Sequence, residues 1–482
     1  MKNAILSTFV AAFKGSRKTW LAVLIMILAP IFTFAQEAVT TTAHAMPEIF
    51  GIRVEFILFA LVLLGVALFH DHTFWVAIIG VTVILIFKLI FDSNFNLLEH
   101  ITGHNSFIDQ LKDKDLRQGE WSTIINLLGL LLGFAVLAKV FEESGVPDIL
   151  PKFLPDDWKG PFMLLIFVCV ISSFLDNIAA ALIGGTIAIV VFKGKVHIGY
   201  IAGIVAASNA GGSGSVVGDT TTTMMWIDGV SPFNVLHAFI AAIVATLFIA
   251  YFAARQQHKL QPIEKDPPVG AKVNWKYLFV VVLILIGAII SNFMYDMPAL
   301  GVWIALIIGS LFTKLPWKEV PGAIMGTIFL LCLVTCASLM PVETLPDAHW
   351  ATAFVLGFVS AVFDNIPLTK LCLEQGHYDW GMLAYAVGFG GSMIWFGSSA
   401  GVAITNKFPE ARNVMLWIRK GWHVTIAYIL GFVVLYFVMG WEPANNKKHT
   451  EPAINCKAIN CKAAHDAKVQ QLGEEQLKKQ KE

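Results

Sequence analysis

The sequence predicts an all-α polytopic membrane protein made of two inverted repeats, each with a re-entrant hairpin and a broken transmembrane helix. Composition is the first reason: 56% of the 482 residues are hydrophobic and 14% are charged, whereas a soluble chain carries about a quarter charged residues. Apolar runs of about 20 residues, the length that crosses a bilayer as a helix, recur along the chain. Finally, two Asp-Asn pairs interrupt such runs, and each is followed by a Gly-Gly-Ser cluster.

The two ends of the chain differ from the apolar part. Residues 1–35 combine basic residues with an apolar run, which is typical of a secretory signal peptide; a retained N-terminal span is the alternative. Residues 441–482 form a polar, Lys-rich tail that we expect to be flexible. Cys456 and Cys461 lie in this tail and would form a disulfide only outside the cytoplasm.

The first repeat is expected over residues 51–254. It begins with three spans, at residues 51–69, 73–91 and 121–141. An uninterrupted apolar run of 32 residues, 161–192, follows. As one helix it would be about 48 Å long, against about 30 Å of hydrocarbon. Because Asp176-Asn177 stands at its middle, the run favours a re-entrant hairpin with this pair at the tip.

A broken crossing then follows at residues 197–226, where glycines and hydroxyl residues interrupt the helix over 208–219. A last span at 232–254 closes the repeat. Residues 255–274 form a polar linker that we place in the cytoplasm.

The second repeat, residues 275–440, follows the same order. Its spans are expected at 275–293, 298–313 and 321–341, its hairpin at 350–373 around Asp364-Asn365, its broken crossing at 380–405 with the interruption at 388–401, and its closing span at 422–440. The Asp-Asn pairs are 188 residues apart and the Gly-Gly-Ser clusters 179 apart.

Each repeat crosses the bilayer five times, so the second repeat enters from the opposite face. Placing residues 1–18 inside also puts basic loops inside, such as those with Lys193, Arg255 and Arg412, and leaves the acidic loop 92–120 outside. This distribution agrees with the positive-inside rule. We therefore expect a multi-pass protein of the inner (cytoplasmic) membrane.

Asp176 and Asp364 are the strongest candidates for a functional role. A carboxylate at bilayer depth is costly, and such residues usually bind ions or protons. Each also suits a helix N-cap, but Ser or Asn would cap without the charge. One carboxylate can hold a proton or a sodium ion, but not both at once. The two aspartates are therefore predicted to bind sodium transiently, in exchange for protons.

Neutral oxygen ligands and unwound backbone are expected to complete this site, because helix ends coordinate ions near the midplane of transporters. Glycines in membranes also serve close helix packing, but here they cluster with polar residues. The candidates beside the aspartates are Asn177, Ser208, Asn209, Gly211, Gly212, Ser213, Asp219 and Thr220 in the first repeat, and Asn365, Gly390, Gly391, Ser392, Ser398 and Ser399 in the second.

Two charged residues allow more than one interpretation. Asp219 is either a third ionisable ligand or the N-cap of the second half-helix, with the following threonine hydroxyls turned to backbone carbonyls. Lys370 either extends to the membrane interface, pairs with Glu374 one turn later, or serves as an internal counter-cation to a carboxylate.

These motifs resemble those of the NhaD-type sodium/proton antiporters. The resemblance rests on 364–367, 388–392 and 397–402 in the second half and on 207–212 and 218–224 in the first, and it covers most of residues 120–440. It extends to the wider ion transporter superfamily, which includes dicarboxylate, citrate and arsenite carriers. It implies a homodimer with a scaffold domain and a transport domain that moves as an elevator.

The chain also departs from that family. Ile178 and the three alanines after it replace hydroxyl residues that commonly follow the first Asp-Asn pair. Val217 stands where relatives often have proline, and Lys370 replaces a small apolar residue. These differences concern ion stoichiometry and selectivity.

Three functions remain to be weighed. The leading hypothesis is secondary exchange of cytoplasmic sodium or lithium for external protons across the lipid bilayer, without a cofactor. The alternative is a sodium-coupled di- or tricarboxylate transporter of the same superfamily. A remote alternative, an intramembrane aspartyl protease, would use Asp219 and Asp296. The chain has 34 basic and 34 acidic residues, and we expect no nucleic-acid partner and no enzymatic activity.

Overall fold

A computed structural model describes residues 47–69, 72–264 and 272–446. Apart from one short hairpin, in which β1 (Glu48–Ile49) pairs with β2 (Ile52–Arg53), the regular secondary structure of this part of the chain is helical. Six of the described helices, counting α13 and α14 as one, are long and apolar enough to cross a membrane. The predicted all-α, multi-pass class is thus confirmed. The 1–35 segment and nearly all of the 441–482 tail, with Cys456 and Cys461, lie outside the described residues.

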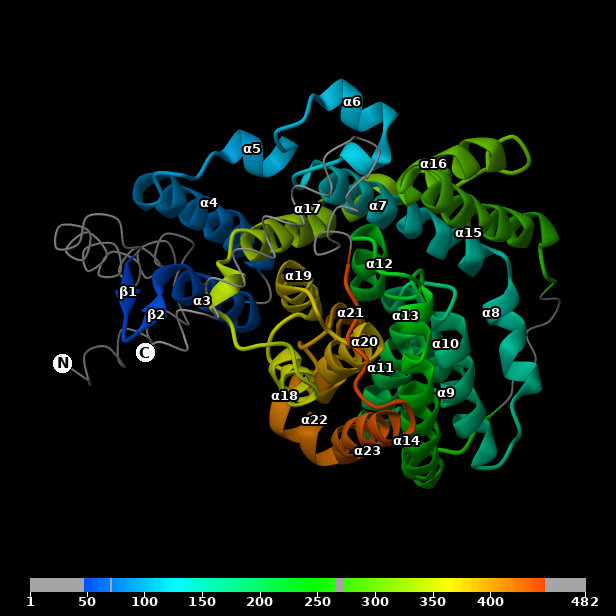
Figure 1. Cartoon of the computed structure of the whole chain (residues 1–482). Coiled ribbons are helices and arrows are strands. Elements are labelled where there is room, and N and C mark those ends of the chain that lie inside the picture. The colour runs from blue at the N-terminus through cyan, green and yellow to red at the C-terminus, as the bar shows by residue number, and fades with distance from the viewer. Residues whose placement is uncertain (1–46, 70–71, 265–271, 447–482) are drawn as a thin grey trace.

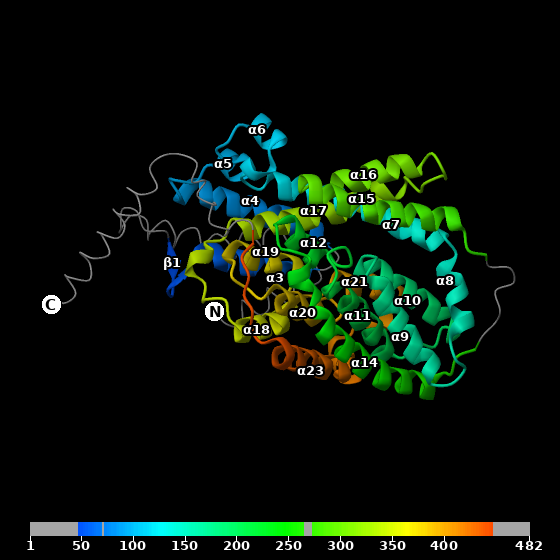
Figure 2. The same ribbon diagram turned by 45° about the vertical axis from the view of Figure 1, so that its right-hand side comes forward.

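Long helices form one side of the molecule, which we call the long-helix layer (Figures 1 and 2). It consists of α3 (Val54–Leu68), α4 (Thr73–Phe91), α7 (Trp121–Glu143), α15 (Trp275–Tyr295), α16 (Pro298–Gly309) and α17 (Glu319–Ser338). Within it, α17 packs on α4 and α7, and α15 packs on α16. All six helices overlap spans that the sequence predicts.

The segment between α4 and α7 is more ordered than the expected loop. It contains α5 (Leu97–Thr102), α6 (Phe107–Lys112) and the short 3-10 helix η2 (Lys114–Leu116). Asn96 starts α5 by accepting hydrogen bonds from the backbone N–H groups of Leu98 and Glu99. Such short capped helices carry no span-length apolar signal, and the sequence analysis missed them.

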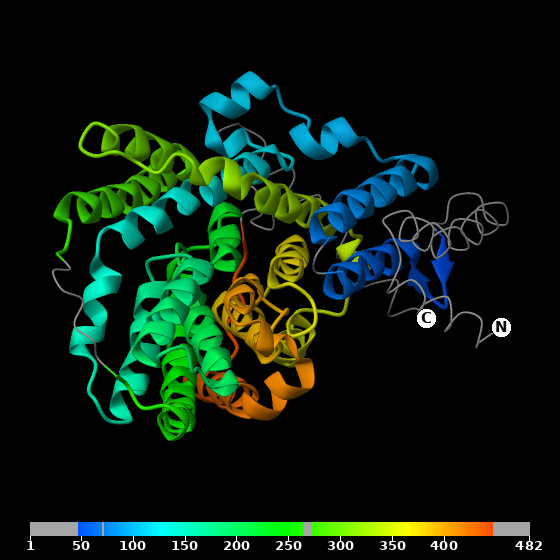
Figure 3. The same cartoon turned by 180° about the vertical axis from the view of Figure 1, so that it is seen from behind.

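The remaining helices form a second group, the hairpin bundle, which Figure 3 shows from behind. From the first half it contains α9 (Lys159–Ser172), α10 (Asn177–Val191), α11 (Ile198–Ser213), α12 (Thr220–Ile227), α13 (Phe233–Leu236) and α14 (Ala238–Leu260). From the second half it contains α18 (Trp350–Ser360), α19 (Asn365–Gln375), α20 (Trp380–Gly390), α21 (Ser399–Lys407), α22 (Val414–Lys420) and α23 (Trp422–Met439). Short connectors complete the fold: α8 (Val146–Ile149), η3 (Leu150–Phe153), η4 (Val342–Thr344), η5 (Gly391–Met393) and η6 (Pro409–Arg412).

Both predicted hairpins are present as pairs of short helices. The run 161–192 divides into α9 and α10, and an aspartate stands immediately before the second helix of each pair. Asp176 Oδ2 accepts a hydrogen bond from the Ile178 N–H at 3.2 Å, and Asp364 Oδ1 accepts one from the Ile366 N–H at 3.0 Å. The capping geometry is therefore real. That the hairpins re-enter the membrane from one side stays a prediction.

Both broken crossings are also present, but their breaks are shorter than expected. The helix continues through Ser213 in the first and through Gly390 in the second. The breaks are therefore 214–219 and 391–398, which consist of turns and the 3-10 helix η5, instead of 208–219 and 388–401. The reason is packing. Nearly every residue of α11 is buried, and small residues let its backbone approach neighbouring helices closely enough to repay the low helix propensity of glycine.

The two halves make matching contacts around these breaks. Ser172 donates a hydrogen bond to the Ser208 carbonyl at 2.5 Å, and Ser360 donates one to the Val387 carbonyl at 2.7 Å. The offset of 188 residues that relates Asp176 to Asp364 also relates Ser172 to Ser360, and the offset of 179 relates Ser208 to Val387. The two hydrogen bonds are therefore equivalent under these offsets, as expected of a duplicated chain. The opposite orientation of the halves stays a prediction.

Gly390 provides a test of this close packing. A Cβ added there would meet the Gly357 carbonyl of α18, which is backbone and cannot rotate away. We expect Gly390→Ala to lower the free energy of unfolding by about 1–3 kcal/mol, the usual cost of overpacking. The measurement is thermal unfolding of the purified protein in detergent.

Gly322→Ala is the matched control, because nothing lies within 4 Å of the Cβ that it adds to α17. It should leave the melting temperature unchanged or raise it slightly, since alanine favours helix. Equal melting temperatures for the two variants would contradict the packing argument.

Candidate ion-binding site

Three aspartates from both halves of the chain meet where the hairpins and the broken helices end. Asp176 and Asp364 lie at the hairpin tips and are half-buried, and Asp219, at the start of α12, is 2% exposed. Both hairpin aspartates are close enough to Asp219 to repel it electrostatically. Like charges assembled away from water are unfavourable unless a proton or a cation joins them.

A chain of amide hydrogen bonds connects the first hairpin to both broken helices. The Asn177 amide donates to Asn209 Oδ1 at 2.9 Å and to Asp219 Oδ1 at 3.0 Å. In turn, the Asn209 amide donates to Ser392 Oγ at 2.9 Å and to Ser398 Oγ at 3.1 Å, both in the second half of the chain. The structure thus brings together five of the predicted site residues in one buried network.

Hydroxyl groups accompany both hairpin aspartates. Ser399 Oγ donates to Asp364 Oδ2 at 3.4 Å, and Thr220, its counterpart in the first half, lies beside Asp176. Each hairpin carboxylate therefore has a capped backbone N–H on one side and a hydroxyl of the broken helix on the other. These groups hold the carboxylates in place and are themselves oxygen ligands.

Neither of the two interpretations of Asp219 describes its position completely. Its backbone occupies the N-cap position of α12, but its side chain makes no capping hydrogen bond. The hydroxyls of Thr222 and Thr223 do turn to backbone carbonyls, bonding to Ser215 O at 2.6 Å and to Asp219 O at 2.8 Å. The carboxylate instead faces Asn177 through Oδ1, and its buried Oδ2 has no hydrogen-bond partner among the described residues.

Other predicted residues do not join this network. Ser208 and Ser213 donate to carbonyls of their own helix, those of Val205 and Ala210. The glycine pairs Gly211-Gly212 and Gly390-Gly391 serve close backbone approach between helices. Asn365 is buried at the second hairpin tip, and its side-chain amide makes no hydrogen bond to another described residue.

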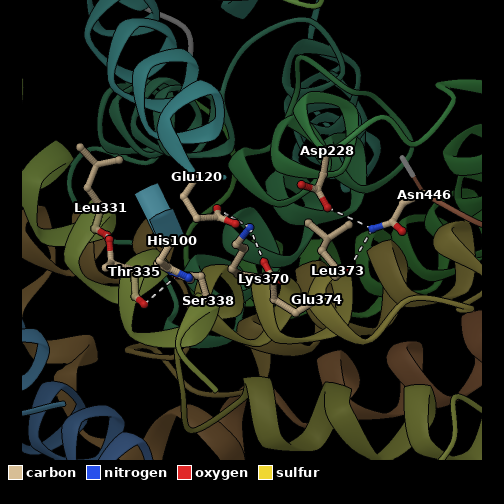
Figure 4. Close-up of polar contacts among 10 residues, drawn as sticks. All are labelled: His100, Glu120, Asp228, Leu331, Thr335, Ser338, Lys370, Leu373, Glu374 and Asn446. Atoms are coloured by element: carbon tan, nitrogen blue, oxygen red, sulfur yellow. Dashed lines mark hydrogen bonds and ion pairs between the residues drawn. The ribbon is translucent and has the colours of Figure 1, made fainter. Parts of the chain in front are cut away.

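Lys370 belongs to a separate cluster between the two groups of helices (Figure 4). Its ammonium lies 2.6 Å from Glu374 and 2.8 Å from Glu120, and its side chain is 0% exposed. The predicted pair with Glu374 is confirmed, and so is the role of internal counter-cation, because Glu120 is a buried carboxylate. The extension to the interface is wrong. The sequence analysis missed Glu120, which precedes α7 and is 250 positions away in the chain.

A second polar contact lies beside this ion pair. Asn446, after α23, donates to Asp228 Oδ2 at 3.0 Å and to the Leu373 carbonyl of α19 at 2.8 Å. The ion pair and this contact together connect α19 to the start of α7, the end of α12 and the segment after α23. Asp296, the other residue considered for a protease, pairs instead with Lys114 at 3.6 Å, and its side chain is 31% exposed.

Known proteins resemble the chain over most of this architecture. Residues 5–390 match the CitMHS family, described as citrate transporter. Sodium/proton antiporter 1 of Arabidopsis thaliana is 26% identical over 317 residues, which are 55% of this chain and 54% of that protein. Sodium/proton antiporter 2 of Arabidopsis thaliana is 29% identical over 45% of this chain and 61% of its own length. The Na(+)/H(+) antiporter NhaD of Alkalimonas amylolytica is 26% identical over 48% and 60%. The chain thus spans between about half and three fifths of these relatives' lengths.

The Lys370 cluster predicts strongly coupled substitutions. Lys370→Met leaves Glu120 and Glu374 buried without their cation, and we expect it to cost about 3–5 kcal/mol of stability, as for other broken buried ion pairs. The double variant Lys370→Met with Glu120→Gln should cost less than the sum of the single variants, because it removes both charges together. Thermal unfolding in detergent measures this double-mutant cycle.

Lys139→Met is the control for the loss of a lysine. Its partner Glu142 lies at 2.9 Å, but the two side chains are 30% and 57% exposed, so the loss should be at most about 1 kcal/mol. Additive effects at Lys370 and Glu120 would refute the interaction.

Proposed function

The chain belongs to the citrate transporter family, a family of membrane transporters, and we propose that it exchanges cytoplasmic sodium or lithium ions for external protons. The observation that supports this proposal most is the meeting of three buried or half-buried aspartates at helix ends, within reach of amide and hydroxyl oxygens. Such an arrangement suits a small cation without its hydration shell. The names of the relatives point to the same pair of ions.

Asp176 and Asp364 would bind sodium and protons alternately. Each keeps its position through its N-cap hydrogen bond and the neighbouring hydroxyl, and carboxylate oxygens that accept one hydrogen bond each keep a lone pair for a ligand. A proton and a cation compete for that oxygen because either one neutralises it, and this competition couples the two flows. The gradient of one ion would then drive the other, so that no cofactor is needed.

The proposal includes the organisation that the sequence predicts. Residues 51–254 and 275–440 would be inverted repeats joined by a cytoplasmic linker at 255–274, in a homodimer of the inner membrane. The matching hydrogen bonds of Ser172 and Ser360 support the duplication. Opposite orientation of the repeats would expose the shared site alternately to the two sides of the membrane.

A sodium-coupled carrier of di- or tricarboxylates is the second candidate, because the matched family is described as citrate transporter. Electrostatics argues against it. The ligand would have to bring two or three negative charges to a site where Asp176 and Asp364 already repel Asp219, and like charges repel more strongly away from water.

Proteoliposomes with a pH-sensitive dye test the leading proposal. A sodium pulse should drive proton movement in the opposite direction, and potassium should not replace sodium. Asp176→Asn with Asp364→Asn keeps side-chain shape but removes both exchangeable charges, so flux should fall at least about tenfold, as when metal-site residues are lost. The exposed Asp347 provides the control: Asp347→Asn should retain wild-type flux. Unchanged flux in the double variant would refute the assigned roles.

Uptake of labelled citrate and succinate by the same proteoliposomes separates the two candidates. We expect no sodium-dependent uptake above that of protein-free liposomes. Saturable, sodium-dependent uptake of either dicarboxylate or tricarboxylate would favour the second candidate and overturn the first if proton flux were absent.

A further inference from the structure

Two helices begin at the aspartate site and run side by side away from it. α12 starts immediately after Asp219, α19 starts immediately after Asp364, and the two helices pack against each other. Asp228 comes nine positions after Asp219. Leu373 likewise comes nine positions after Asp364. Because nine residues of helix are about 14 Å long, the far ends of both helices lie at a similar distance from the site.

One buried amide joins these far ends (Figure 4). Asn446 Nδ2 donates to Asp228 Oδ2, at the end of α12, at 3.0 Å and to the Leu373 carbonyl of α19 at 2.8 Å. The Asn446 side chain is 1% exposed, whereas Pro443 and Asn445 before it are exposed. An amide is costly to bury without hydrogen bonds, so the inward position of Asn446 depends on these two acceptors.

Other contacts already attach this end of the described chain to the bundle. The Trp380 indole N–H donates to the Ala444 carbonyl at 2.7 Å, and the Ala444 N–H donates to the Tyr378 carbonyl at 3.0 Å. Both contacts are made to the connection between α19 and α20. Attachment of the chain therefore does not require Asn446, whose amide reaches further and includes α12.

The position of α12 depends on such tertiary contacts. α12 is eight residues long, and isolated helices of this length are marginal. Non-helical segments flank it on both sides, at 214–219 and 228–232. In addition, Asp364 repels Asp219 electrostatically, which drives the starts of α12 and α19 apart. A joint at the far ends of the two helices opposes that separation.

We propose that Asn446 is a positioning residue: it clamps α12 to α19 and thereby sets the separation of the carboxylates at the starts of these helices. The inference rests on the proposed function, in which the aspartate site binds the transported cation. Without the clamp, Asp219 and Asp364 move apart under their own repulsion, and a cation that depends on several oxygen ligands binds less tightly.

Sodium-dependent thermal stabilisation of the purified full chain tests the proposal without requiring transport. Sodium chloride is titrated at constant ionic strength with choline chloride, and the melting temperature gives the apparent affinity, since a ligand that binds the folded state stabilises it. Asn446→Ala should weaken the apparent sodium affinity by about tenfold, the scale seen when groups that orient metal ligands are lost.

Flux kinetics in proteoliposomes distinguish positioning from a merely structural role. Positioning predicts that Asn446→Ala raises the sodium KM by about tenfold, while the maximal flux at saturating sodium stays within about twofold of the wild type. Loss of folded protein would instead lower the maximal flux and leave the KM unchanged. An unchanged KM in Asn446→Ala would overturn the proposal.

Two further variants keep the test decisive. Asn445→Ala removes the exposed asparagine next in the chain and should bind sodium as the wild type does; an equal loss of affinity in this variant would refute a specific role of Asn446. If Asn446→Ala does not fold, Asp228→Asn keeps the shape of the acceptor but removes its charge. Because hydrogen bonds to charged groups are about twice as strong, Asp228→Asn should weaken sodium affinity by about threefold, and wild-type affinity would overturn the proposal.

The proton-flux assay separates this inference from the proposed function. Sodium binding that depends on Asn446 in a protein without proton flux would support the clamp and refute the exchange. Sodium-driven proton flux with a wild-type KM in Asn446→Ala would support the exchange and refute the clamp. A wild-type protein that neither binds sodium nor moves protons would refute both.

Discussion

Satisfying a carboxylate away from water is the constraint on which the rest of this structure depends. Asp219 is buried, and the amide that holds it comes from the tip of the first hairpin. That tip can reach Asp219 only because α11 ends at Ser213 and the chain restarts as a helix at Thr220. The same network continues through Asn209 to the second half of the chain. The hairpin tip and the helix breaks together therefore offset the cost of burying this charge.

Much of this architecture could be predicted from the sequence because its signals are local. An Asp-Asn pair in the middle of 32 apolar residues, too many for a single crossing, indicates a hairpin without knowledge of any partner. The repetition of that signal after 188 residues predicts the second hairpin. The membrane-spanning helices could be predicted equally well, because their length and apolar composition are read directly from the sequence.

Features that depend on contacts between distant residues could not be predicted from the sequence. The predicted extent of the first helix break was wrong, because the packing around α11 allows residues 208–213 to remain helical. Glu120 lies in a segment that the sequence describes only as an acidic loop, and nothing local indicates that its carboxylate meets Lys370.

The ion pair of Lys370 has a consequence for how fast the molecule can change shape. It connects α19, an arm of the second hairpin, to Glu120, the residue immediately before α7 in the long-helix layer. Any rearrangement that slides this arm along α7 must separate a lysine and a glutamate whose side chains are both buried. Such a separation adds to the activation barrier of the rearrangement, and about 1.4 kcal/mol of barrier slows a step tenfold. The pair therefore slows any rearrangement of this kind.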